Sequence, residues 1–137
     1  MSAPQYLLDT DICIFIRRHR RPALTDRFRA LLPGQAAISV VTYGELANGA
    51  ERSDSPETAR SALQALLQFL PVQPLPTNAG EAYGLIRAQL ERQGKTIGGN
   101  DLWIAAHALA AGFILVTNNE RAFRRVSDLT IENWAAR

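Results

Sequence analysis

The chain has 137 residues, of which 47% are hydrophobic and 20% charged, and its net charge is +2. With 9 glycines and 7 prolines, this composition excludes a disordered, collagen-like or low-complexity protein. The single cysteine, Cys13, excludes an intramolecular disulfide and a multi-cysteine zinc site. We expect one domain over residues 1–137 and a cytoplasmic location, because the sequence has no signal peptide and no apolar run approaching ~18 residues.

The N-terminal part of the chain alternates between strand and helix patterns. Tyr6–Leu8 is a short apolar run that predicts a buried strand, and the apolar residues of Ile12–Ile16 predict a first helix. A second helical spacing runs over Leu24–Leu32 and is stopped by the Pro-Gly pair at 33–34. The second strand is predicted at Ala37–Val41, which is rich in β-branched residues.

The middle of the chain is predominantly helical. Thr42–Ala50 reads as a helix opened by its threonine, and a further helix opens at Pro56. Val72–Leu75 has prolines at positions 71, 74 and 76, which predicts a short edge strand rather than a central one. Asn78–Arg92 carries apolar residues on one helical face and predicts a long helix.

The C-terminal part supplies the most apolar strand. Asn100 is a good N-cap for a helix over Asp101–Ala111, which Gly112 closes. Phe113–Val116 follows as a strand. Strands that alternate with helices predict an α/β fold, in which a parallel sheet is covered by helices on both faces.

Three acids and one amide follow the predicted strands. Asp9 ends the first strand, and Asn119 lies just past the last one. Glu45 and Asp101 are predicted in first turns of helices. In open parallel sheets, functional sites collect at the carboxyl ends of the strands, so these side chains are expected at one edge.

Each acid also has a purely structural explanation. Asp9 would serve as a helix cap, and Thr42-x-x-Glu45 matches a capping box. Asp101 would complement a helix dipole. Three carboxylates at one edge, however, repel one another unless they are protonated or neutralised by a cation.

Oxygen ligands of this kind favour Mg²⁺ or Mn²⁺, and the sequence offers no cluster of histidines and cysteines for zinc. Such an ion lowers the pKa of a bound water and stabilises a leaving oxygen. The pattern therefore predicts a divalent-metal site suited to hydrolysis of a phosphodiester.

The basic residues are almost all arginines, since Lys95 is the only lysine among 15 basic side chains. Arginine favours bidentate contacts to phosphate. A basic run is also common on a solvated helix face or in salt bridges, so both interpretations stay open. The densest group comprises Arg17, Arg18, Arg20, Arg21, Arg27 and Arg29.

Longer stretches carry a family resemblance. The chain contains LLDTDICI, AISVVTYGELANGA, IGGNDLWIAAHALAAGFILVTNN and RAFRRVSDLTIENW. Over essentially the whole chain, these stretches resemble PIN domains, in particular the VapC-type toxins of bacterial toxin–antitoxin pairs. The resemblance implies a PIN-like α/β/α sandwich with a central parallel sheet of four to five strands. It also implies a Mg²⁺- or Mn²⁺-dependent endoribonuclease.

The resemblance assigns roles motif by motif. Asp9 in LLDTD and Asp101 in GGNDLWIA match acids that bind metal, and Glu45 in YGEL matches the second acid of the family. Thr117 in LVTNN matches a small hydroxyl residue beside the site. Asn119 stands where many PIN domains have a fourth acid, so the choice between one ion and two stays open.

Two other acids, Asp11 and Glu120, are close in sequence to this set without occupying the matching position.

The resemblance also implies partners. A VapB-type antitoxin is expected to inhibit the chain, and operator DNA is expected to be bound only through that antitoxin. A homodimer is expected, with Leu63–Leu70 as a contributor. Transfer RNA is the expected substrate and ribosomal RNA its rival. Contacts to RNA phosphates or to an acidic antitoxin segment are expected from Arg17, Arg18, Arg20 and Arg21.

Two alternatives remain. A non-catalytic α/β module would bind RNA or a protein with its basic surface, and the acids would be caps. Asp9 and Asp11 also resemble the DxD motif of haloacid dehalogenase-like phosphatases. That mechanism needs a lysine after a threonine, whereas here Lys95 precedes Thr117.

Overall fold

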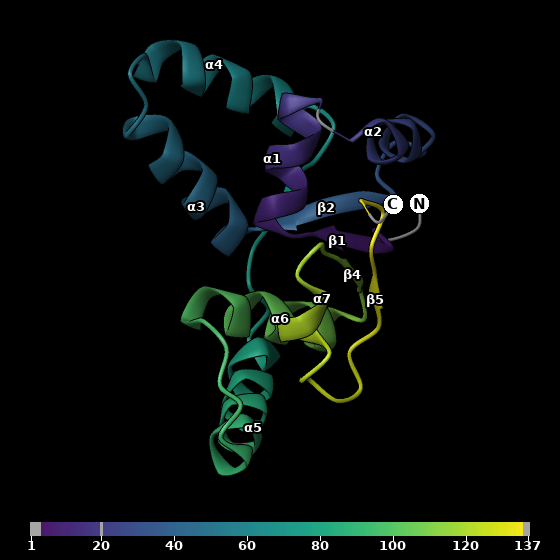
Figure 1. Cartoon of the computed structure of the whole chain (residues 1–137), viewed down its shortest axis with the longest axis vertical. Helices are drawn as coiled ribbons and strands as arrows, with labels where there is room; N and C mark the ends of the chain where they lie inside the picture. Colours follow the sequence, from purple (N-terminus) through teal and green to yellow (C-terminus); the bar gives the residue numbers. More distant parts are fainter. Residues whose placement is uncertain (1–3, 20, 136–137) are drawn as a thin grey trace.

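The computed structural model describes residues 4–19 and 21–135 and confirms the α/β fold (Figure 1). All pairings in its five-stranded sheet are parallel, and the strand order is β3-β2-β1-β4-β5. The strands are β1 (Tyr6–Leu8), β2 (Ala36–Ser39), β3 (Val72–Gln73), β4 (Ile114–Val116) and β5 (Ile131–Glu132). The helices are α1 (Thr10–Arg18), α2 (Pro22–Arg29), α3 (Val40–Glu51), α4 (Pro56–Leu67), α5 (Asn78–Gln93), α6 (Gly99–Ala111) and α7 (Glu120–Phe123).

Alternating side chains of the strands divide the core into two layers. Tyr6 and Leu8 of β1 pack with α1, α3 and α4, whereas Leu7 packs with α5 and α6 on the opposite face. Successive side chains of a strand point to opposite faces, so a strand buried on both sides must be apolar throughout. This requirement explains why the β1 sequence is an unbroken apolar run.

The strand order reverses at β1. The chain runs outward from β1 to β2 and β3, and then returns to place β4 and β5 on the other side of β1. Leu8 is in register with Val116, so β1 and β4 end at the same level. The crevice at such a switch point, beyond the strand ends, is where open α/β sheets place their sites.

The second strand is shorter than its β-branched sequence predicts. The expected strand over Ala37–Val41 is wrong at its end, because Val40 and Val41 already belong to α3. The Ser39 hydroxyl accepts a hydrogen bond from the Val41 N–H at 3.1 Å and starts the helix. Thr42 therefore does not open α3, and the predicted capping box with Glu45 does not form.

The start of α6 also differs from prediction. Gly98 occupies the N-cap position and accepts the first helical hydrogen bond from the Leu102 N–H at 2.9 Å, so Asn100 lies inside the helix and exposed. The edge strand β3 confirms the prediction for Val72–Leu75 in a shorter form. The short elements α7 and β5 were not predicted.

The C-terminal segment packs against the start of β1 and against α2. The Trp134 ring packs edge-on against Tyr6, with 4.9 Å between the centroids. The Arg27 guanidinium lies 4.8 Å from the centre of the Trp134 ring, and Arg21 donates to the Ala135 carbonyl at 3.1 Å. Two residues of the basic group therefore have structural partners.

The leucines expected to contribute to a dimer are core residues. Leu63, Leu66 and Leu70 are buried in the core, whereas Phe69 is the large apolar side chain that this segment exposes. A contribution of Leu63–Leu70 to a dimer stays a prediction. Among the described residues, no helix has the length and apolar character needed to span a membrane.

A buried hydrogen bond connects β2 with α6. The Ser39 oxygen lies 2.8 Å from Nδ1 of His107, and both side chains are buried. Burial lowers the pKa of His107, so its ring is neutral at pH 7. The Ser39 hydroxyl therefore forms hydrogen bonds both with the N-terminus of α3 and with the buried ring nitrogen of His107.

We expect Ser39→Ala to lower the free energy of unfolding by about 2 kcal/mol, because it removes a cap and leaves a buried polar atom unpaired. Urea denaturation would measure this loss. Ser61→Ala, at an exposed position of α4, is the matched control and should change stability by less than about 0.5 kcal/mol. Equal denaturation midpoints for the two variants would contradict this prediction.

Candidate active site

Asp9 lies buried at the switch point, with only 4% of its surface exposed. As the N-cap of α1, its carboxylate accepts the Ile12 N–H at 3.0 Å, which confirms the structural role considered for it. The other carboxylate oxygen accepts from the Thr117 hydroxyl at 2.5 Å. The Thr117 oxygen in turn accepts the Asn119 N–H at 2.9 Å. The ends of β1 and β4 thus hold one carboxylate in a fixed orientation.

The environment of Asp9 disfavours its charged form. Burial, with a smaller contribution from the nearby Asp11 and Asp101 carboxylates, raises its pKa from 3.8 to about 7. The hydrogen bonds from Thr117 and Ile12 oppose this shift without cancelling it. Over residues 4–19 and 21–135, Asp9 therefore has no ion pair that would compensate its charge.

A hydrogen bond from the Thr10 hydroxyl holds Glu45 near the end of β1. It lies in the second turn of α3, and its Oε1 accepts from the Thr10 hydroxyl at 2.5 Å. The Thr42 oxygen lies 3.4 Å from that of Thr10. Glu45 thus reaches the residue next to Asp9 instead of folding back onto its own helix. Sequence reasoning missed Thr10, although it directly follows the acid in LLDTD.

Asp101 is half-buried in the first turn of α6. Burial raises its pKa, and the carboxylates of Glu45 and Asp11 raise it further. Asp9, Glu45 and Asp101, which are far apart in sequence, therefore lie within electrostatic range of one another. This proximity is the one that sequence reasoning predicted.

The residues near the fourth acidic position divide into two groups. Asn119 lines a small cavity together with Asp101. Glu120 is held elsewhere, by Arg124 at 2.6 Å and by Asn133 at 3.0 Å. Asp11 is exposed but close enough to raise the pKa values of Asp9 and Asp101. Asp11, rather than Glu120, thus adds negative charge to the site.

The acidic oxygens match the ligand preferences of a hard divalent cation. Within residues 4–19 and 21–135, no three Asp, Glu, His or Cys side chains converge closely enough to hold one metal ion. The side chains are thus gathered at one edge without forming a closed coordination sphere.

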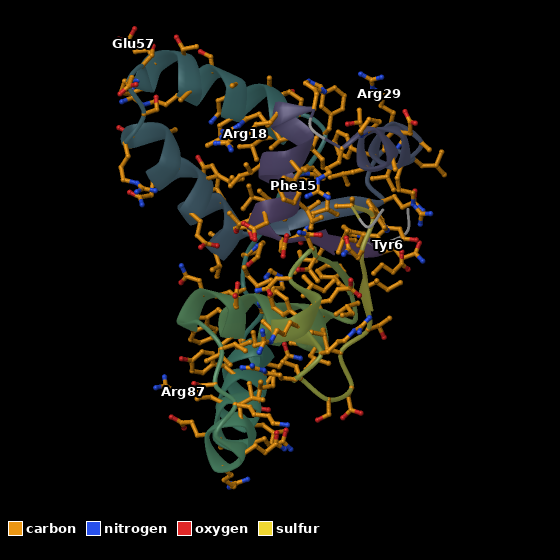
Figure 2. The ribbon with its side chains drawn as sticks, in the orientation of Figure 1. Tyr6, Phe15, Arg18, Arg29, Glu57 and Arg87 are labelled. Carbon is orange, nitrogen blue, oxygen red and sulfur yellow. The ribbon has the colours of Figure 1, made fainter. Side chains whose placement is uncertain are left out.

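The basic group lies away from the acids. Arg17 and Arg18 line a hollow between the end of α1 and the α3–α4 connection, and Figure 2 shows Arg18 at that end of α1. At 1.5 Å per residue, the eight-residue step from Thr10 to Arg18 is roughly 12 Å along the helix. Arg21 is engaged with Ala135, and Arg20 lies outside the described residues.

Comparison with known protein families shows that the sequence model of the PIN-domain family matches residues 6–129. The chain belongs to the PIN-domain family. This PIN domain is 40% identical over 131 residues to the tRNA(fMet)-specific endonuclease VapC of Shigella flexneri, covering 96% of this chain and 98% of the relative. It is also 40% identical over 130 residues to ribonuclease VapC2 of Haemophilus influenzae, covering 95% and 98%.

Among solved structures, the PIN domain resembles the DNA-bound VapBC from Salmonella typhimurium with a TM-score of 0.90 and 37% identity, covering 96% of this chain and 98% of that one. The resemblance to VapC proteins is confirmed, and the five-stranded parallel sheet agrees with it. The haloacid dehalogenase interpretation of Asp9 and Asp11 is set aside by this family membership.

We expect Asp9→Asn to stabilise the fold at pH 8 in metal-free buffer. With a pKa of about 7 when folded and 3.8 when unfolded, the folded chain binds the Asp9 proton more tightly. Ionisation of Asp9 therefore lowers the free energy of unfolding as the pH rises from 4 to 7, and its contribution is constant above pH 7. Asparagine cannot ionise and still caps α1. The gain reaches at most about 4 kcal/mol at pH 8, since a tenfold change in proton affinity is about 1.4 kcal/mol.

Denaturation at pH 5 and pH 8 would measure the gain, which should shrink at the lower pH. Asp54→Asn, at an exposed position between α3 and α4, is the control and should show no such pH dependence. A lower stability of Asp9→Asn than of the parent at pH 8 would refute the prediction.

Proposed function

We propose that this PIN domain is a metal-dependent endoribonuclease and the toxin of a VapBC toxin–antitoxin pair. The observation that carries the proposal is the buried Asp9 carboxylate, which lies at one sheet edge with Asp101 and Glu45 and forms no ion pair within the part of the chain that the structure describes. The names of the relatives support it, since they are an endonuclease specific for tRNA(fMet) and a ribonuclease.

The proposed metal is Mg²⁺ or Mn²⁺, held by Asp9, Asp101 and Glu45. When bound, such an ion lowers the pKa of a water molecule and stabilises charge on the leaving oxygen. The chemistry of the donors fits this ion, and the mutual repulsion of the acids favours its binding. Side-chain rotations must accompany binding, because the acids do not yet converge.

The remaining side chains are assigned to orientation and proton transfer. Thr117 fixes the orientation of Asp9 through its hydroxyl and is itself held by the Asn119 N–H. Glu45, anchored by Thr10, orients the attacking water and accepts its proton. Asn119 completes the pocket by hydrogen bonding. Because asparagine is a weaker ligand than a carboxylate, we propose a single ion.

The proposed substrate is transfer RNA, cleaved in the cytoplasm. The proposed regulator is a VapB-type antitoxin, because the similar structure from Salmonella typhimurium is a VapBC complex bound to DNA. Operator DNA would be bound through the antitoxin. We also propose a homodimer, which light scattering would test.

We expect purified protein to cleave transfer RNA with Mg²⁺ or Mn²⁺, and EDTA to abolish the cleavage. Asp9→Ala and Asp101→Asn should each lower the rate on the order of a hundredfold or more, the scale for losing a group that stabilises the transition state. Electrophoresis of the RNA products measures the rate, and circular dichroism checks the fold.

Glu120→Gln is the matched control, because this acid lies near the site but is held by Arg124 and Asn133. It should cleave at the parental rate. Parental cleavage by both Asp9→Ala and Asp101→Asn would reject the proposed metal site. A parent that binds RNA or a protein without cutting would instead support the non-catalytic module.

We expect the double variant Arg17→Ala/Arg18→Ala to weaken binding of an acidic antitoxin segment and to retain RNA cleavage. The reason is that both residues lie at the far end of α1 from Asp9. Titration calorimetry at two salt concentrations would measure the loss, which should be larger at low salt. Arg92→Ala, at an exposed site near the end of α5, is the control. Lost cleavage with intact antitoxin binding would assign the pair to RNA instead.

A further inference from the structure

We infer that a small cavity beside Asp101 is a phosphate subsite for the RNA strand, and that Arg121 and Arg125 are its binding residues. The inference rests on the proposed ribonuclease function and adds to it a second contact point on the substrate. Asp101, Glu45 and Asp9 would act on the phosphodiester that is cut, whereas this cavity would hold a neighbouring phosphate.

The cavity has a volume of about 220 Å³ and lies between three segments of the chain. The loop before α6 and the first turn of α6 form one side, with Gly98 and Asp101. Asn119, at the N-terminus of α7, and two arginines that follow it form the other side. The cavity therefore lies beside a proposed metal ligand, between the start of α6 and α7. Figure 1 shows where these two helices lie.

The three arginines in and after α7 differ in their partners. Arg124 forms an ion pair with Glu120 at 2.6 Å. Arg125 lines the cavity and donates one hydrogen bond to the Thr96 carbonyl at 3.0 Å, which holds its guanidinium in place without neutralising its charge. Arg121 is exposed, and over residues 4–19 and 21–135 it has no carboxylate partner within 4.0 Å.

Two uncompensated positive charges thus lie next to a cluster of carboxylates. A guanidinium binds a phosphate through two parallel hydrogen bonds, and its charge does not depend on pH in the working range. The pair therefore supplies the attraction for a polyanion that the acidic edge lacks.

Two further observations favour phosphate over a base. The residues that line the cavity, all of them described, include no aromatic ring on which a base would stack. Gly98 caps α6 without a side-chain hydrogen bond, so the positive end of the helix dipole adds to the potential of the two arginines, while the Asp101 carboxylate in the same turn opposes it. The lining is thus suited to a compact anion.

The test compares Arg121→Gln with Arg124→Gln, which removes a charge from the same short segment but from an arginine that is already paired. Binding of unfractionated transfer RNA is measured over a range of salt concentrations on the Asp9→Asn background, so that the RNA stays intact. We expect Arg121→Gln to weaken binding about tenfold, as the loss of a charge-assisted contact does. The slope of log affinity against log salt should fall by about 0.7.

Arg124→Gln should change neither quantity, and Arg121→Lys should retain the salt slope because it keeps the charge. On the parental background, Arg121→Gln should raise KM for cleavage and leave kcat unchanged, since the contact is made equally in ground and transition states. Thermal denaturation of each variant checks that the fold is intact.

Equal RNA affinity for Arg121→Gln and Arg124→Gln, with a parent that still cuts, overturns the subsite and leaves the proposed function standing. Loss of antitoxin binding alone in Arg121→Gln also overturns it and points to a carboxylate of a protein partner. A parent that neither binds nor cuts RNA rejects the proposed function and the subsite with it.

Discussion

The arrangement of the candidate site depends on one buried carboxyl group, that of Asp9. Asp9 lies where β1 ends, in the crevice created by placing β2 and β4 on opposite sides of β1. Burial of a carboxylate is unfavourable, and here two hydrogen bonds only partly offset the cost. A fold that keeps such a group without a paired cation retains it at the expense of stability. This is the pattern of a functional site, where activity and stability are in conflict.

The rest of the molecule positions partners around that carboxylate. A sheet buried on both faces fixes which side chains enter which layer, so the ends of β1 and β4 are set by core packing. Thr117 contacts Asp9 because Leu8 and Val116 are in register. Glu45 and Asp101 arrive on helices from opposite layers and meet at the same edge. The geometry of the site is thus a consequence of the hydrophobic core beneath it.

Short patterns in the sequence predict much of this arrangement. Unbroken apolar runs predict β1 and β4, and an acid directly after a strand predicts a position at the sheet edge. The start of α3 differs from prediction because β-branched residues favour strands in general, whereas the Ser39 cap begins a helix there. The start of α6 differs because asparagine is a common N-cap, whereas here the Gly98 carbonyl accepts the first helical hydrogen bond.

Other features depend on contacts between distant segments, and local patterns do not carry that information. The Thr10–Glu45 hydrogen bond, the Ser39–His107 pair and the separate positions of Arg121 and Arg124 belong to this class. The two-residue strand β5 is too short to show any periodicity. The arginines of the N-terminal part are a further example. The sequence shows how many there are, but not that Arg21 and Arg27 contact the C-terminal segment.

The hydrogen bond between Asp9 and Thr117 joins residues that are 108 positions apart. Ribosomes make proteins from the N-terminus, at about 5–20 residues per second, and early segments wait for later ones before such contacts form. A nascent chain would therefore expose its first acid for several seconds without the hydroxyl that orients it. Assembly of the centre is postponed until β4 has left the exit tunnel, so an unfinished polypeptide carries the acids but not their arrangement.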